Sequence, residues 1–156
     1  MNTVEETLSV ARKFYKKYAK CYNRNMSEMK MHKLMYFVQR ESLMYYNTPL
    51  FGEPFLGWKY GPVLLSIRKE YKKRNPFARI DKDISQESTK LVDNVFSRYG
   101  SISPWKLSAL SHNEFSWKKA RIGLNSEDNG KKELSLQAMK IDAIRELSER
   151  NESDKP

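Results

Sequence analysis

Hydrophobic residues recur at spacings of three and four along most of the chain, which is the period of an amphipathic helix. The pattern predicts a first helix from about Val4 to Tyr22 and a second over residues 28–46, with Ser27 as the N-cap of the second. The inward stripe predicted for the first helix is Val4, Leu8, Ala11, Tyr15, Tyr18 and Tyr22, and that for the second is Met31, Leu34, Met35, Val38 and Ser42.

The middle of the chain has shorter apolar runs that do not follow the helical period. Two of them flank the turn-forming segment Gly52-Glu53-Pro54, which predicts a small β-hairpin or a pair of extended arms near residues 50–59. Directly afterwards, Gly61 permits a sharp backbone turn and Pro62 suits the first position of a helix. We therefore expect an extended segment that turns into a third helix, from Pro62 to about Arg74.

The second half of the chain contains four more helical patterns. Serines at positions 85, 103 and 135 are predicted N-caps, and residues 113–121 form one further short helix. The inward residues predicted for the last helix are Leu136, Met139, Ala143, Ile144 and Leu147. Together these elements indicate a mainly α protein. We expect a single compact helical domain of about six or seven helices in residues 1–150, followed by a frayed tail at residues 151–156.

Charge changes this picture, because the formal net charge of +10 is unevenly placed. Residues 12–24 and residues 59–79 each carry +6, and the remainder of the chain sums to −2. Such segments suit an acidic protein partner or nucleic acid, although a solvated helix face has the same composition. The candidate contacts for such a partner are Lys13, Lys17, Lys20, Lys69, Lys72, Lys73 and Arg74.

Membrane insertion and secretion are not indicated. The chain has no apolar stretch of about 18 residues, which a membrane-spanning helix would need. Its acidic N-terminus lacks the apolar core of a signal peptide, and Cys21 has no second cysteine with which to form a disulfide. We therefore expect a cytoplasmic protein.

Residues that could carry catalysis do not occur in any standard arrangement. Two histidines and one cysteine cannot make a zinc site of normal spacing, and no phosphate-binding glycine loop is present. Ser111-His112 lacks a placed acid, so a nucleophile–base pair is not indicated. We expect no enzyme, no catalytic residue, no metal and no cofactor, with His112 and Trp117 in structural roles.

The segment Trp58-Lys59-Tyr60-Gly61-Pro62-Val63 is the most distinctive in the chain. Aromatic side chains with a polar tip are typical anchors of protein interfaces, and a lysine beside them adds charge. Lys59, Tyr60 and Arg68 are therefore the candidate partner-binding residues. Trp58, Gly61 and Pro62 are expected to be structural. The alternative is that Trp58 and Tyr60 both fill the core between helices.

Five segments of the chain resemble the motifs of a known family. They are Met31–Gln39, Pro49–Phe55, Trp58–Val63, Tyr99–Leu107 and Ser111–Arg121. Their order and spacing are similar to those of the Panacea domain family, also called SocA-like or phage-associated GepA-like. The resemblance covers about residues 5–122. The chain departs from the usual pattern with His32 in place of Gln, Ser111 in place of Thr and Ser116 in place of Pro.

The resemblance implies a mostly helical antitoxin of a toxin–antitoxin pair, often encoded in prophages or phage-defence loci. Its partner would be a cognate toxin protein, neutralised by direct binding. One branch of the family instead acts as a proteolytic adaptor that delivers the toxin to a AAA+ protease. A third interpretation, drawn from the charge, is a nucleic-acid-binding regulator that uses the two basic segments.

Overall fold

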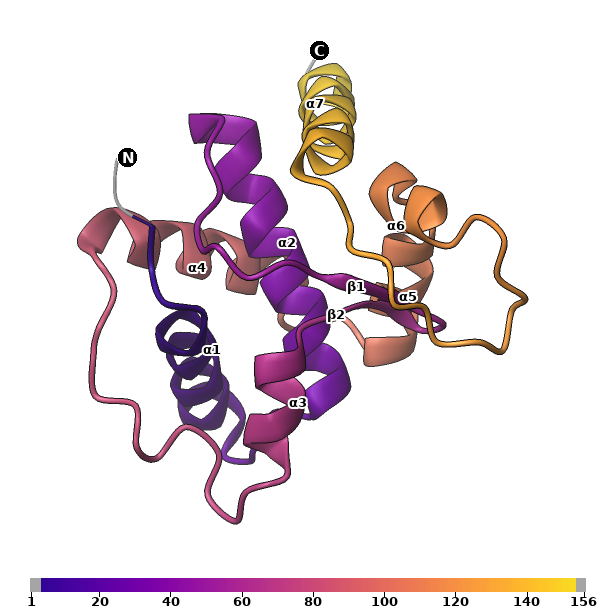
Figure 1. The fold of residues 1–156 in the computed structure, drawn as a ribbon. Helices are drawn as coiled ribbons and strands as arrows, with labels where there is room; N and C mark the ends of the chain where they lie inside the picture. Colours follow the sequence, from indigo (N-terminus) through magenta and orange to yellow (C-terminus); the bar gives the residue numbers. More distant parts are fainter. Residues whose placement is uncertain (1–3, 154–156) are drawn as a thin grey trace.

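The computed structural model describes residues 4–153, and seven helices and one two-stranded sheet lie in this part of the chain (Figure 1). The elements are α1 (Thr7–Tyr22), α2 (Glu28–Tyr46), β1 (Leu56–Trp58), β2 (Gly61–Val63), α3 (Leu65–Tyr71), α4 (Gln86–Tyr99), α5 (Pro104–His112), α6 (Phe115–Ala120) and α7 (Leu136–Ser153). The prediction of a mainly α fold with a small hairpin is confirmed. No helix of the described chain has the length and apolar character needed to cross a membrane.

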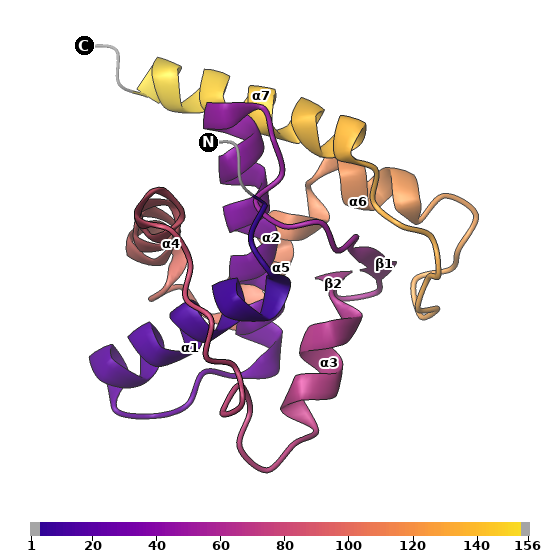
Figure 2. The same ribbon diagram turned by 60° about the vertical axis from the view of Figure 1, so that its left-hand side comes forward.

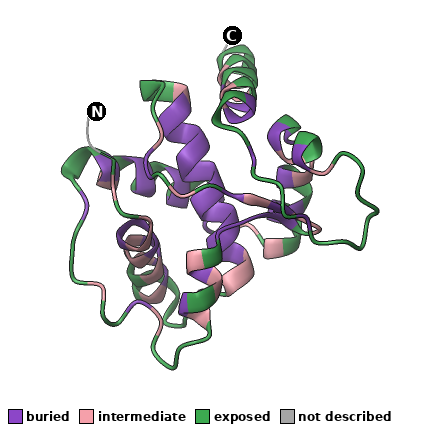
Figure 3. Ribbon diagram, in the orientation of Figure 1, coloured by how far each residue is buried: buried purple, intermediate pink, exposed green. Residues whose placement is uncertain are grey.

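Helix α2 lies at the centre of the fold and contacts α1, α3, α4, α5, α7 and β2. Every residue from Lys30 to Leu43 is buried, as the continuous purple of this helix in Figure 3 shows. All five residues of the predicted inward stripe are buried, and burial extends beyond them because neighbours cover α2 on all sides. Its buried polar side chains are compatible with this position because most of them meet partners from distant parts of the chain.

Helix α1 begins later than predicted. The chain before it is extended, and the backbone N–H of Glu5 donates a hydrogen bond to the carbonyl of Leu50 at 2.7 Å. Val4 therefore lies outside the helix and is 56% exposed. The buried face of α1 includes Val10 and Phe14, which the predicted stripe omitted.

The hairpin forms, but further along the chain than predicted. Strands β1 and β2 are antiparallel, with Trp58 opposite Gly61, so the turn is Lys59-Tyr60. Pro62 lies in β2 and does not begin a helix, which corrects the prediction for that residue. The predicted turn residue Glu53 instead binds the first turn of α3, where its carboxylate accepts a hydrogen bond from the N–H of Ser66 at 3.1 Å.

The predicted N-caps are confirmed. The serine hydroxyls at 27, 85, 103 and 135 each accept a hydrogen bond from a backbone N–H three residues later. These bonds set where α2, α4, α5 and α7 begin.

Helix α7 lies across the C-terminal half of α2 (Figure 2). Its buried residues are Ala138, Met139, Asp142 and Ala143. Ile144, predicted to face inward, is 69% exposed, and Leu136 is also exposed. The helix continues through Ser153, past the predicted start of the tail, and residues 154–156 of that tail lie outside the described part of the chain.

Candidate binding site at the hairpin turn

The turn between β1 and β2 is held against three helices. The carbonyl of Tyr60 accepts hydrogen bonds from the Lys33 ammonium on α2 and from the Ser108 hydroxyl on α5. The indole N–H of Trp117 on α6 donates to the carbonyl of Trp58 at 2.8 Å. These bonds from side chain to backbone fix the position of the turn, although the turn itself is short and close to the surface.

Gly61 allows the turn to approach α2 this closely. Its φ of +120° lies in the region that residues with a side chain avoid. A Cβ at this position would lie 2.7 Å from the Ser111 hydroxyl and would also collide with the Lys33 ammonium. The prediction that Gly61 permits the turn is confirmed, whereas the helix expected after it starts only at Leu65.

A chain of polar contacts runs along one side of the turn. The His32 ring accepts a hydrogen bond at Nδ1 from the N–H of Leu64, so its Nε2 carries the proton and donates to Glu28 at 3.0 Å. Burial lowers the pKa of His32, so the ring is neutral near pH 7. Arg68 donates to the same Glu28 carboxylate and lies 5.1 Å from the centre of the Trp58 ring.

These residues surround a groove of about 440 Å³ whose walls include His32, Lys33, Trp58, Lys59, Tyr60 and Arg68. The three predicted partner-binding residues, Lys59, Tyr60 and Arg68, therefore lie around one concave surface. Tyr60 is 51% exposed, so the alternative that it fills the core is wrong, whereas Trp58 is only partly exposed. The groove has aromatic walls and cationic side chains.

Two residues, one in the wall of the groove and one beside it, were not singled out from the sequence. Trp105 is 66% exposed and meets the Tyr60 ring edge to face, with ring centres 5.8 Å apart. Lys33 is 2% exposed, and burial lowers the pKa of its ammonium to about 8. Lys33 lies among apolar residues in a helical pattern, and this pattern indicates burial. Trp105 follows a helix start, and its position in the sequence does not indicate a contact with the hairpin turn.

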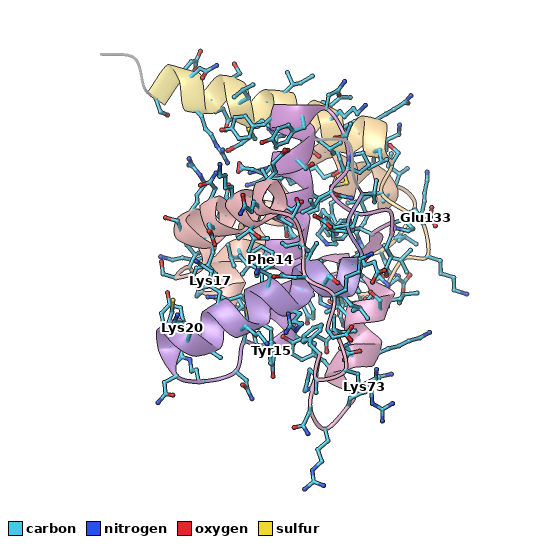
Figure 4. The ribbon with its side chains drawn as sticks, turned by 90° about the vertical axis from the view of Figure 1, so that its left-hand side faces the viewer. Phe14, Tyr15, Lys17, Lys20, Lys73 and Glu133 are labelled. Atoms are coloured by element: carbon cyan, nitrogen blue, oxygen red, sulfur yellow. The ribbon has the colours of Figure 1, made fainter. Side chains whose placement is uncertain are left out.

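The seven cations predicted as nucleic-acid or acidic-partner contacts are spread over two regions. Lys13 pairs with Asp83 at 3.0 Å and Lys17 with Asp93 at 2.9 Å. Figure 4 shows Lys17 and Lys20 on α1, away from Lys73 beyond the end of α3. Lys73 is also paired, with the carboxylate of its neighbour Glu70, while Lys69, Lys72 and Arg74 are exposed. Acids of the chain itself therefore neutralise part of this charge.

His112 packs against the same turn. Its ring stacks on Trp117 with 4.2 Å between ring centres and 3° between planes. Burial and the nearby Lys33 ammonium lower the pKa of His112. Within residues 4–153 no cluster of three or more histidine, cysteine or acidic side chains could hold a metal ion.

A second polar cluster lies on the far side of α2. Arg40 is buried and donates hydrogen bonds to Glu114 and to the Tyr99 hydroxyl. Arg145 of α7 donates to the other oxygen of the Glu114 carboxylate at 2.6 Å. This carboxylate binds guanidinium groups from α2 and α7, so it links these two helices.

Comparison with known proteins gives one result. No curated protein and no solved structure matches the chain. A sequence model of the family described as "Antitoxin SocA-like, Panacea domain" matches residues 31–118, which is more than half of the chain. The matched segment contains most of α2, the hairpin and α3 to α5, and thus every residue named above as a wall of the groove. The chain therefore belongs to the SocA-like antitoxin family with a Panacea domain.

Proposed function

We propose that this protein is a cytoplasmic, non-enzymatic antitoxin that neutralises a cognate protein toxin by direct binding at the hairpin turn. The observation that carries the proposal is the pair of exposed aromatic rings, Tyr60 and Trp105, beside a groove with cationic side chains. Exposed aromatic clusters next to a concave surface are typical of protein interfaces. The family membership supports a toxin as the partner.

A co-expression assay tests this proposal. The reading frame next to the gene is expressed alone and together with this protein, and growth is measured. We expect toxicity from the neighbour alone and rescue by the wild-type chain. If no neighbouring product is toxic, or if a toxic one is not rescued, the antitoxin function is wrong.

The binding surface is tested separately, with Tyr60→Ala and Trp105→Ala in one chain. Tyr46→Ala is the matched control, because Tyr46 is 40% exposed at the other end of α2. We expect the double variant to lose at least about tenfold in toxin affinity, which is about 1.4 kcal/mol, because truncating a central interface residue commonly costs more than about 1 kcal/mol. Equal affinity of the double variant and the control would place the interface elsewhere.

We do not extend the proposal to nucleic acid or to a protease. Lys13, Lys17 and Lys73 are paired with acids, and this leaves them less suited to phosphate contacts. A salt titration of any DNA or RNA binding is the direct check, since phosphate contacts make affinity fall steeply with salt.

A further inference from the structure

Among the residues that the structure describes, none serves as a counter-ion for the buried ammonium of Lys33. Its hydrogen-bond partner is the carbonyl of Tyr60, and among residues 4–153 no carboxylate pairs with it. An ammonium has three N–H donors, so one carbonyl leaves donor capacity unused. A buried charge is costly unless it is paired, which makes an unpaired one a candidate for function.

Other buried charges of the chain differ from Lys33 in this respect. Arg40 pairs with Glu114, Glu41 with Arg150, and Glu70 with Lys73. Lys30 also lacks a carboxylate partner, but its ammonium lies 5.3 Å from the centre of the Tyr18 ring and donates to the carbonyl of Gly100. Lys30 does not contribute to the groove, whereas Lys33 forms part of its inner wall.

The groove as a whole has an excess of positive charge. Lys33, Lys59 and Arg68 contribute three cations, and Glu28 contributes one carboxylate that is already shared by Arg68 and His32. The ion pair of Lys59 with Glu127 is long, at 3.7 Å, and the Glu127 side chain is 82% exposed, so this pair holds Lys59 weakly. A negatively charged group entering the groove would find no competing acid at Lys33.

We propose that the inner end of the groove receives a carboxylate from an aspartate or glutamate side chain of the bound toxin, with Lys33 as its counter-ion. The aromatic walls at Trp58 and Tyr60 contact the apolar part of the same segment. The toxin would therefore present an acidic side chain next to apolar ones. This inference rests on the proposed antitoxin function and adds the chemistry of the partner.

The test compares two methionine variants, Lys33→Met and Lys30→Met, in the full chain. Methionine keeps most of the length of the side chain and removes the buried charge. In Lys33→Met the carbonyl of Tyr60 keeps its hydrogen bond from the Ser108 hydroxyl, so we expect neither variant to lower the melting temperature by much. We expect Lys33→Met to bind the toxin at least about tenfold more weakly than the wild type, and Lys30→Met to bind within about twofold. Folding of both variants is checked by circular dichroism.

A second measurement uses the wild-type chain alone and does not depend on how the variants fold. A carboxylate beside Lys33 favours its charged form, so binding of the toxin at about pH 8.5 takes up protons. Calorimetry in buffers of different ionisation enthalpy measures that uptake. The titratable and charged groups that line the groove with Lys33 are Glu28, His32, Lys59, Tyr60 and Arg68, and His112 also interacts with its ammonium. The two histidines are neutral at this pH, because the pKa of each is lowered.

The possible outcomes separate the two proposals. If the wild type does not bind the toxin, the antitoxin function and this inference both fail. If the wild type binds but Lys33→Met binds equally well, or if no protons are taken up, only the inference fails. Acetate and inorganic phosphate are titrated as probes of a small-anion site. Tight, saturable binding of either one in the absence of toxin would overturn the assignment to a protein carboxylate.

Discussion

Lys33 holds a charge inside the protein, and this has a direct effect on stability. Burial lowers the pKa of its ammonium from 10.5 to about 8. Between these two values the unfolded chain binds a proton at this residue and the folded chain does not. The free energy of unfolding therefore rises with pH in this window. Below about pH 8 the folded protein bears the full destabilisation caused by burying the charge.

This gives a prediction for the pH dependence of stability. From about pH 7.5 to pH 10, the free energy of unfolding of the wild type is expected to gain about 2–3 kcal/mol relative to Lys33→Met. Urea unfolding at a series of pH values measures the difference. Parallel curves for the two proteins would mean that the ammonium is not desolvated in the folded state.

Gly61 is the second residue with an unusual requirement. Its φ is +120°, and a side chain there would collide with Ser111 and Lys33. Gly61→Ala is therefore expected to lower the free energy of unfolding by about 1–3 kcal/mol. Gly52→Ala is the control, because a Cβ at Gly52 would meet nothing within 4 Å, and its effect should be within about 0.5 kcal/mol. Similar unfolding curves for the two alanine variants would contradict this account.

At the scale of the elements, local signals predicted the starts of helices well. Ser27 and Ser103 were recognisable N-caps because capping depends on neighbours within three residues. The hairpin was misplaced because Glu53 resembles a turn residue and Pro62 a helix start. In the structure Glu53 binds the first turn of α3 and Pro62 lies in β2. The contact between Glu53 and Ser66 joins residues that are not neighbours in a helix or a turn, so no local pattern shows it.

Glu53 supplies the cap of α3 from outside the helix. One oxygen of its carboxylate accepts from the N–H of Ser66 and the other from the Ser66 hydroxyl, at 3.1 and 2.5 Å. Glu53→Ala is expected to cost about 1 kcal/mol of stability, the usual value for a lost cap. Thermal unfolding checks this, with the exposed Glu133→Ala as the control. If both variants melt alike, the cap contributes nothing.

In the candidate site, too, the sequence predicts residues from their local pattern but not those that depend on contacts between distant parts of the chain. Lys59, Tyr60 and Arg68 could be proposed from residue type and from their place at a turn. Lys33 and Trp105 could not, because their importance comes from contacts with Tyr60 in the hairpin turn, which is 27 residues from Lys33 in the sequence. Periodicity indicates that a side chain is buried but not which groups it meets.

At the scale of the whole molecule, ion pairs join α2 to the C-terminal helices. Glu114 is 1% exposed and Arg40 is 5% exposed, and Arg145 of α7 binds the same carboxylate. Arg150, further along α7, donates to Glu41 at 2.6 Å. Removing one member of such a buried set leaves the others without a counter-charge.

Glu114→Gln is therefore expected to lower the free energy of unfolding by about 3 kcal/mol. The control is Glu127→Gln, because the Glu127 side chain is 82% exposed and its loss should cost at most about 0.5 kcal/mol. Urea unfolding of both variants at about pH 8.5 gives the comparison, because burial raises the pKa of Glu114 to about 7 and its carboxylate is charged only above that value. A cost for Glu114→Gln as small as that of the control would show that the buried pairs do not hold the helices together.

The position of α2 has a consequence for how the protein is made. This helix is synthesised early, yet α7, which covers its C-terminal half, is the last helix of the described chain. While the ribosome still holds the later segments, much of the apolar surface of α2 has no cover. We therefore expect a chain truncated before α7 to be cleaved by added protease faster than a chain that includes α7, because part of the surface of α2 then lacks its cover.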